Sequence, residues 1–226
     1  MTISSRLKLI AEMVKTPTVA DIGTDHGHLP IYLVKSGKVI RALAADINPG
    51  PLDGAKKNIS HWELEDFVET RLCDGLCGIN PEEYTTCVIA GMGGLLIMDI
   101  LRKNLPQAQG FKQLLLSPQR DVRALRVFLH KNNFRITDEE LIAEHGKYYN
   151  ILDAAKGHEP AYDEKGYMFG RKLIEKRSPA LKQMVAAEIF KTNSILTGLN
   201  GHNVRKAELE LYLQHCKEVL ACLHAI

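Results

Sequence analysis

The chain has 226 residues, which suits one domain of about 150 residues with an appendage, or two small domains. Its formal net charge is only +2 and 45% of its residues are hydrophobic, so composition indicates an ordinary globular protein and favours no class of partner. No secretory signal or membrane-length apolar run is visible, and the five cysteines lack zinc-type spacing, so we expect a cytoplasmic protein with reduced thiols, no disulfide framework and no membrane association.

The first residues predict an amphipathic helix that ends before Pro17, because its apolar residues recur every three or four positions: Ile3, Leu7, Ile10 and Val14. Beyond it, strand-like and helix-like segments alternate. We expect strands over 18–23, 39–47, 67–73, 86–90, 111–117, 134–141 and 148–155. Helices are expected over 29–36, 50–61, 94–104 and 122–131. This alternation predicts an α/β fold with a mostly parallel sheet, to which the closing pair adds an antiparallel strand.

Beyond Lys156 the pattern becomes helical. One apolar stripe comprises Leu181, Val185, Ile189, Thr192, Leu196 and Leu199. A second has coiled-coil spacing and comprises Leu209, Leu213, Cys216, Leu220 and Leu223. With Asn200 and Gly201 as a turn, these stripes predict a helical hairpin. We therefore expect domains over 1–157 and 158–226, and we favour packing within the chain over a dimer seam, which predicts a monomer or a weak dimer.

The loop after the first strand carries two acids around a glycine, Asp21-Ile-Gly23-Thr-Asp25. It has neither the glycine pattern of dinucleotide-binding folds nor the lysine of a phosphate loop. Two carboxylates would repel a pyrophosphate but complement the sulfonium and ammonium of S-adenosylmethionine. The loop therefore favours that cofactor, and the alternative is a glycine turn with solvated acids.

The ends of the next strands supply further candidates. Asp46 stands where an acid commonly binds a ribose diol, and Asp74 is placed to bind the exocyclic amine of adenine. A helix cap and an Asp-Gly turn are the alternatives, and the glycines after the fourth strand also suit a tight turn. The predicted cofactor-binding set is Asp21, Gly23, Asp25, His26, Asp46, Ile47, Asp74, Gly75, Gly91, Met92 and Gly93.

Several motifs together resemble the bacterial tRNA (adenine-22-N1)-methyltransferase family. They are DIGTDHGHLPIYL (21–33), ADINPGPLDGAKKN (45–58), CDGL (73–76), AGMGG (90–94), LLLSPQRDVRALRVFL (114–129) and EHGKYYNIL (144–152). The resemblance implies a Rossmann-like seven-stranded methyltransferase domain followed by a coiled-coil-like helical domain. It also implies methyl transfer from S-adenosylmethionine to N1 of adenine 22 in the D-arm of tRNA, without indicating a catalytic residue.

A carboxylate near the cationic product base would stabilise it, which makes Asp25 the catalytic candidate. His26 or Tyr32 could stack on an extruded base, the alternative being a core or surface role. Two segments are rich in cations, 117–135 with five bases against one acid and 165–182 with six against one. They predict tRNA contact, the alternative being a solvated surface. The predicted substrate-binding set is Tyr32, Arg120, Arg123, Arg171, Lys172 and Arg177.

Two other functions stay open from the sequence alone. One is a methyltransferase of a small molecule or protein, and the other is a non-catalytic RNA-binding scaffold. A nicotinamide oxidoreductase is disfavoured by the acids around Gly23. No metal site is expected, since the paired histidines and cysteines lack partner ligands.

Overall fold

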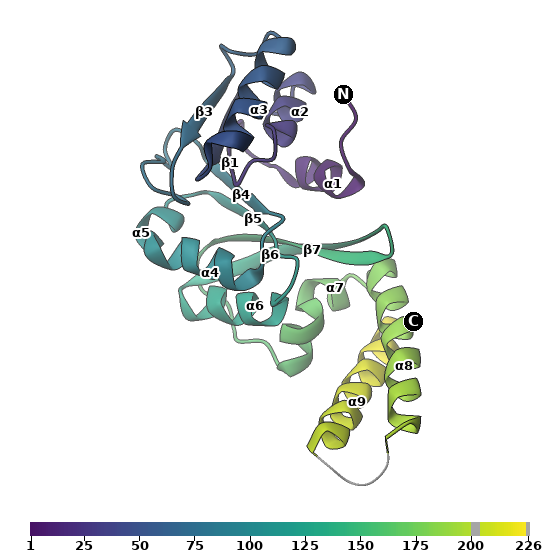
Figure 1. The fold of residues 1–226 in the computed structure, drawn as a ribbon. Helices are drawn as coiled ribbons and strands as arrows, with labels where there is room; N and C mark the ends of the chain where they lie inside the picture. Colours follow the sequence, from purple (N-terminus) through teal and green to yellow (C-terminus); the bar gives the residue numbers. More distant parts are fainter. Residues whose placement is uncertain (200–203, 225–226) are drawn as a thin grey trace.

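A computed structural model describes residues 1–199 and 204–224 of the chain, so the predicted turn at Asn200 and Gly201 lies outside the described residues. A seven-stranded sheet in the order β3-β2-β1-β4-β5-β7-β6 forms the centre (Figure 1). The strands are β1 (Thr18–Ile22), β2 (Arg41–Asp46), β3 (Val68–Leu72), β4 (Thr86–Ala90), β5 (Gln113–Ser117), β6 (Phe134–Glu144) and β7 (Lys147–Lys156). The strands β1 to β5 pair in parallel, and β7 runs antiparallel to both neighbours, which confirms the predicted closing pair.

Helices cover both faces of the sheet. One face carries α1 (Ser5–Met13), α2 (His28–Lys35) and α3 (Pro49–His61), and the other carries α4 (Gly94–Lys103), α5 (Leu105–Ala108) and α6 (Val122–Lys131). Successive strand residues point to opposite faces. Val19 and Val88 accordingly lie in the core beneath the first group of helices, whereas Ala20 and Ile89 lie in the core beneath the second. Both faces of these strands are thus buried, as the continuous apolar runs predict.

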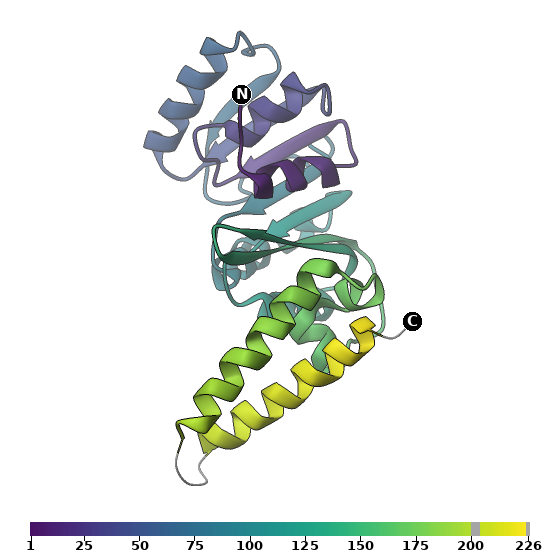
Figure 2. The same ribbon diagram turned by 90° about the vertical axis from the view of Figure 1, so that its right-hand side faces the viewer.

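The C-terminal part forms η1 (Gly166–Gly170), α7 (Arg171–Glu175), α8 (Pro179–Thr197) and α9 (Val204–His224). The last two helices run side by side and extend away from the sheet (Figure 2). Leu181, Val185 and Cys216 of the predicted stripes are fully buried in a third core cluster, which also includes Leu141 of β6. The helical hairpin therefore shares its apolar core with the edge of the sheet.

A buried ion pair between α6 and β6 also contacts the C-terminal part. Arg126 of α6 and Glu139 of β6 have side chains only 1% exposed, and Arg126 Nε donates to Glu139 Oε1 over 2.6 Å. The same guanidinium donates to the carbonyl oxygens of Tyr167 and Met168 in η1 and to the side chain of Asn150. Segment 166–170 is thus held against the sheet by hydrogen bonds as well as by apolar packing.

The predicted helices and strands are confirmed, with boundaries that differ by a few residues. No pattern in the sequence predicts α5, η1 and α7, because these helices have only four or five residues and are too short to show an apolar period. The strands β6 and β7 are longer than predicted, because their tip is polar and only the pairing of the two strands satisfies its backbone. No helix in the described part of the chain is long and apolar enough to cross a bilayer.

Candidate cofactor site

The register of the sheet brings the ends of its central strands level. Ile22, the last residue of β1, lies beside Ala45 of β2 and Ile89 of β4. The loops that follow are bonded across the sheet, since the Gly23 N–H donates to the Ala45 carbonyl over 2.8 Å. The Gly91 N–H likewise donates to the carbonyl of β5's last residue over 3.2 Å. Side chains just beyond these strands are therefore held together, where ligands bind in open α/β sheets.

Two adjoining cavities open at these strand ends, and we call them together the cofactor groove. The first has a volume of about 360 Å³ and is lined by Asp21, Gly23, Asp25, Asp46, Gly91 and Met92, among others. The second has about 250 Å³, shares Gly23, Asp46 and Met92 with the first, and adds Ile47, Asp74 and Gly75. Most of the predicted cofactor-binding residues thus meet in one groove. His26 and Gly93 do not line either cavity.

Gly23 is required at the junction of the two cavities for two reasons. Its φ of +72° lies in the left-handed region, which a residue with a side chain rarely adopts. A β-carbon built on it would also lie 2.0 Å from Cε of Met92. The methyl end of the Met92 side chain therefore packs directly on Gly23, and both residues line the two cavities.

Asp21 has an unusual electrostatic environment. The residue is 6% exposed and accepts a hydrogen bond of 2.8 Å from Thr24 Oγ1. Burial raises the pKa of the Asp21 carboxyl to about 7, and the nearby carboxylates of Asp25 and Asp46 shift it in the same direction, against the Thr24 hydrogen bond. A cation in the groove would favour ionisation of this carboxyl.

The other acids are more accessible. The Asp25 side chain is 89% exposed at the rim of the first cavity. Asp46 Oδ1 accepts from the backbone N–H of Asn48 over 2.7 Å, which fixes the carboxylate at the end of β2. Asp74 lies 3.2 Å from Lys103 Nζ of α4, across the second cavity. The groove thus combines one buried acid with three that are accessible from solvent.

Sequence reasoning missed several residues of the groove. His28 lines the first cavity in place of His26, whose ring packs over the backbone of Gly54. The first helical residue after Gly27 is His28, so the start of α2 was the available signal. Arg6 of α1 and Gln119 also line the first cavity, and no pattern near them in the sequence marked either one.

The predicted tRNA contacts separate in space. Arg120 has a side chain 80% exposed, and its Nε lies 3.1 Å from where a β-carbon of Gly93 would stand, so it borders the glycine loop after β4. Arg123 instead forms two hydrogen bonds with Glu164, of 2.6 and 2.9 Å. The structure does not bring Tyr32 to the groove, since its side chain lines a separate hollow between α1 and α2.

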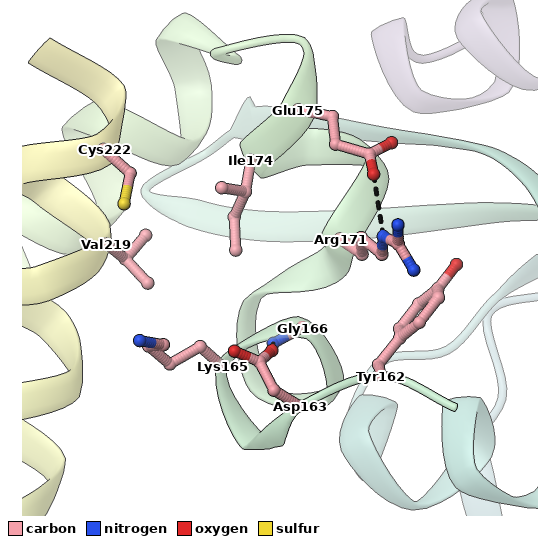
Figure 3. A pocket seen from close by; sticks show the side chains of 9 residues that line it. All are labelled: Tyr162, Asp163, Lys165, Gly166, Arg171, Ile174, Glu175, Val219 and Cys222. Atoms are coloured by element: carbon pink, nitrogen blue, oxygen red, sulfur yellow. Dashed lines mark hydrogen bonds and ion pairs between the residues drawn. The ribbon is translucent and has the colours of Figure 1, made fainter. Parts of the chain in front are cut away.

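The remaining three lie in the C-terminal part. Arg171 lines a third cavity of about 380 Å³ between η1, α7 and α9, where it is hydrogen-bonded to Glu175 (Figure 3). Lys172 also pairs with Glu175, at 3.6 Å. Arg177 is exposed and forms no ion pair with the residues that the structure describes. None of the three lines the cofactor groove.

This sheet order, with acids gathered at the ends of β1, β2 and β3, defines a Rossmann-like S-adenosylmethionine-dependent methyltransferase. Comparison with known families makes the assignment specific. A family model described as tRNA (adenine(22)-N(1))-methyltransferase, TrmK, matches residues 19–218. The chain belongs to this family, which confirms the resemblance seen in its motifs.

Individual relatives agree with this membership. The chain is 32% identical over 223 residues to the tRNA (adenine(22)-N(1))-methyltransferase of Bacillus subtilis, covering 96% of this chain and 92% of that protein. A Streptococcus pneumoniae protein solved with S-adenosyl-L-methionine superposes with a TM-score of 0.87 and 32% identity, covering 97% of this chain and 100% of that one. TrmK of M. capricolum, solved with S-adenosyl-homocysteine, has a TM-score of 0.86 and 28% identity, with coverage of 98% and 99%.

Proposed function

We propose that the protein transfers the methyl group of S-adenosylmethionine to N1 of adenine 22 in tRNA. The observation that carries the proposal is the meeting of Asp21, Asp25, Asp46 and Asp74 in one groove at the strand ends, in a chain of this family. A cluster of carboxylates suits a cationic methyl donor and opposes a phosphate-bearing nucleotide. The rival functions of small-molecule or protein methylation and of RNA scaffolding lack a comparable observation.

The residues of the groove fit this cofactor. We assign Asp46, fixed by the Asn48 N–H, to the ribose hydroxyls and Asp74 to the adenine amine. Asp21 and Asp25 would face the cationic groups, since both line the first cavity. When bound, S-adenosylmethionine supplies a methyl group already activated by its sulfonium. The protein therefore has to bind and align the reactants rather than activate the methyl donor.

Adenine N1 attacks with its own lone pair, so no general base is needed for the transfer. In a base-paired stem N1 is engaged, so the base has to leave the stack to reach the groove. Alignment of N1 with the methyl group is then the main source of rate enhancement. We propose that the exposed carboxylate of Asp25, at the rim of the groove, stabilises the positive charge that develops on the base.

For tRNA binding we propose two contributions. Arg120 stands beside the glycine loop with its side chain exposed, where a phosphate near the target base would lie. Domain 158–226 adds a more distant contact through the exposed Arg177. Arg123 and Arg171 are hydrogen-bonded to acids, whereas Arg120 and Lys172 lie 3.7 and 3.6 Å from one. We assign cofactor binding to domain 1–157, and we expect the protein to act in the cytoplasm because its proposed substrate is tRNA.

Mass spectrometry of nucleosides tests the proposal. Unmodified tRNA incubated with the protein and S-adenosylmethionine should gain 1-methyladenosine, and a tRNA with guanine at position 22 should gain none. Methylation of another atom, or of the guanine-22 tRNA, would overturn the assigned position. Absence of a salt-sensitive tRNA complex would favour a small-molecule or protein substrate. Absence of S-adenosylhomocysteine binding would favour the scaffold.

A further inference from the structure

Gln119 brings an unpaired carboxamide to the cofactor groove. It is the second residue after β5, it is exposed, and it lines the first cavity together with Asp21 and Gly91. Of the described residues that line this cavity, it alone has a carboxamide side chain. That group forms no hydrogen bond with any other described residue. A carboxamide donates and accepts at the same time, so this one is free to bind a ligand that does both.

Three backbone hydrogen bonds fix the loop that carries Gln119. Its own N–H donates to the Met92 carbonyl over 2.8 Å. On either side of this bond, the Gly91 N–H donates to the carbonyl of the last residue of β5 over 3.2 Å, and the Gly94 N–H donates to the Arg120 carbonyl over 3.0 Å. The loop after β5 is therefore held against the glycine loop after β4, which gives Gln119 a defined position beside the glycines.

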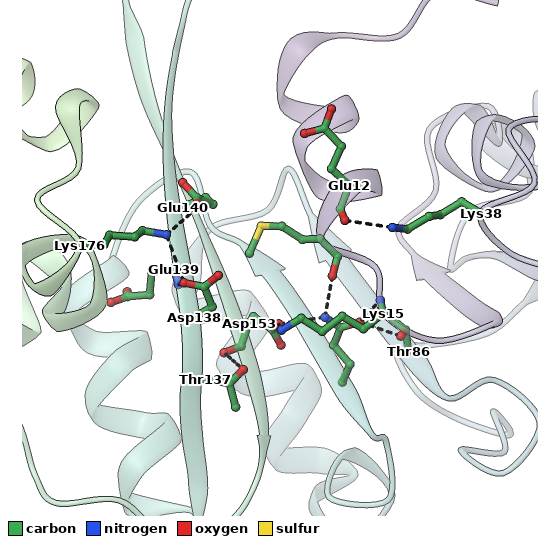
Figure 4. A network of polar contacts seen from close by, with 12 residues as sticks. Glu12, Lys15, Lys38, Thr86, Thr137, Asp138, Glu139, Glu140, Asp153 and Lys176 are labelled. Carbon is green, nitrogen blue, oxygen red and sulfur yellow. Dashed lines mark hydrogen bonds and ion pairs between the residues drawn. The ribbon is translucent and has the colours of Figure 1, made fainter.

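The far end of β5 is fixed as well. Gln113, the first residue of the strand, is 3% exposed, and its side-chain oxygen accepts the Lys15 N–H and the Thr86 hydroxyl, both over 3.0 Å. Its side-chain nitrogen donates to Asp153 Oδ2 over 2.9 Å, and Lys15 Nζ lies 2.6 Å from the same carboxylate oxygen (Figure 4). A strand tied to both neighbours at its start and at its end cannot slide, so the loop at its end stays level with the groove.

Gln119 lies beside the place where the methyl group would be presented. The proposed function puts the adenosine of the cofactor in the second cavity and the rest of the molecule in the first, so the methyl group lies where the two cavities meet. Gly23 and Met92 line both cavities and mark this junction. Because the Gln119 N–H is bonded to the Met92 carbonyl and its side chain is exposed, a base that enters from solvent would meet it there.

A carboxamide matches the edge of adenine that the reaction leaves free. Adenine presents its N6 amine and its N7 acceptor side by side, and glutamine binds this pair through two hydrogen bonds without touching N1. A contact on the Watson–Crick edge would instead occupy N1, the atom that has to attack. Guanine presents two acceptors, O6 and N7, to the same carboxamide, which can satisfy only one of them.

We infer that Gln119 binds the target adenine, accepting a hydrogen bond from its N6 amine and donating one to N7, and so selects adenine over guanine. The inference rests on the proposed function and names the residue that recognises the base. During transfer the N1–C bond forms, the S–C bond breaks, and the positive charge passes from sulfur to the base, where the N6 amine shares it. The bond from N6 to the Gln119 oxygen strengthens as that charge develops, so the contact contributes to rate as well as to selection.

Methyl-transfer kinetics on two tRNAs test the inference. The tRNAs differ only at position 22, which carries adenosine or 7-deazaadenosine, an analogue with C–H in place of N7. Gln119→Ala should lower kcat/KM on the adenosine tRNA by about 10- to 100-fold, the range of a bidentate contact to a base. It should also lower the preference for adenosine over the analogue by about 3- to 10-fold, because the variant has no donor for N7. Comparing preferences between variants cancels the different basicity of N1 in the analogue.

Two further variants and one binding measurement complete the test. Gln119→Glu keeps an acceptor for N6 but loses the donor for N7, so it should lose the preference for adenosine while retaining more activity than Gln119→Ala. Gln183→Ala removes an exposed glutamine of α8 that lines neither cavity, and it should change neither quantity. In calorimetry, Gln119→Ala should bind S-adenosylhomocysteine within about twofold of the wild type, because the residue contacts the base and not the cofactor.

The outcomes separate the inference from its rivals. An equal loss on both tRNAs would make Gln119 a contact to the tRNA backbone or a support of the structure, and would overturn the inference. Weaker binding of S-adenosylhomocysteine would make it a cofactor contact, and unchanged kinetics would leave it no part in recognition, so either result overturns the inference too. If the wild-type protein does not methylate the adenosine tRNA, the proposed function itself fails, and that result does not depend on Gln119.

Discussion

We expect burial of the Asp21 carboxyl to lower the free energy of unfolding at neutral pH. Asp21→Asn keeps the shape of the side chain and an oxygen to accept the hydrogen bond from Thr24 Oγ1. It removes a group that can ionise at the end of β1, where the residue is 6% exposed. Because a buried charge is costly, the variant should be more stable than the wild type wherever Asp21 is ionised.

The size and the pH range of the effect follow from the pKa. Burial raises the pKa of Asp21 from 3.8 to about 7 in the folded protein. Between these values the folded state binds more protons than the unfolded state, so the free energy of unfolding falls as pH rises. At about 1.4 kcal/mol per pKa unit, the penalty reaches about 4 kcal/mol above the folded pKa. It vanishes below the unfolded value.

Urea unfolding at several pH values between 4 and 8 measures the difference. Asp21→Asn should match the wild type within about 1 kcal/mol at the acid end and exceed it by about 2–4 kcal/mol at pH 8. Asp53→Asn is the matched control, because it removes an exposed carboxylate of α3 that is not among the acids near Asp21. A stability difference between wild type and Asp21→Asn that stays constant across this range would refute the reasoning.

The same substitution should weaken binding of the cofactor. A cation in the groove is bound more tightly by ionised Asp21, so the affinity of the wild type for S-adenosylmethionine should rise as pH rises through about 7 and then level off. In Asp21→Asn that rise should disappear while stability increases. The groove would then combine lower stability with cofactor binding, a common balance at functional sites.

Four other substitutions, one of them a control, probe the groove and its support. Asp46→Ala should weaken S-adenosylhomocysteine binding by about 1–3 kcal/mol in calorimetry, and unchanged affinity would remove Asp46 from the site. Gly94→Ala should lower the free energy of unfolding by about 1–3 kcal/mol, because its β-carbon would lie 2.8 Å from a backbone oxygen. Gly93→Ala is the control: its β-carbon would meet only the flexible side chain of Arg120, so the loss should be less than about 1 kcal/mol. Glu139→Gln should cost about 3–5 kcal/mol in urea unfolding, because it leaves the buried Arg126 without a counter-charge, and a cost below about 1 kcal/mol would contradict that role.

Local patterns in the sequence predicted the sheet and much of the groove. The alternation of strands and helices predicts a parallel sheet whose strand ends lie level. An acid at the end of such a strand therefore lies at that edge of the sheet however the helices pack. Asp46 and Asp74 therefore line the groove as predicted. His26 does not, because the choice between it and His28 depends on where α2 begins and on the packing of a ring over Gly54.

The basic segments show where counting along the chain fails. Arg126 was counted as part of a positive surface, but its side chain is 1% exposed and paired with Glu139. Lys165 pairs with Glu218 at 2.8 Å, 53 residues further along the chain. The acids that neutralise these cations come from other elements of the fold, so a local excess of basic residues overstates the positive charge of the surface.

For Arg6, in contrast, the local sequence understates the functional importance of the charge. The local sequence shows only a basic residue near the start of an amphipathic helix, which is ordinarily a solvated position. Glu144 and Tyr149 lie more than 130 residues away in the sequence. Glu144 accepts backbone N–H groups at the start of α1, Tyr149 contacts the Arg6 guanidinium, and Arg6 lines the groove together with its acids. Long-range pairing thus neutralises several cations that seemed available for tRNA, and long-range contacts hold one that seemed ordinary beside the acids of the cofactor groove. The positive charge relevant to function therefore depends on how closely the fold pairs each cation with a carboxylate. At the groove, Nη1 of Arg6 has no hydrogen-bond partner among the described residues, and Arg120 at the rim is 80% exposed with Asp121 3.7 Å away.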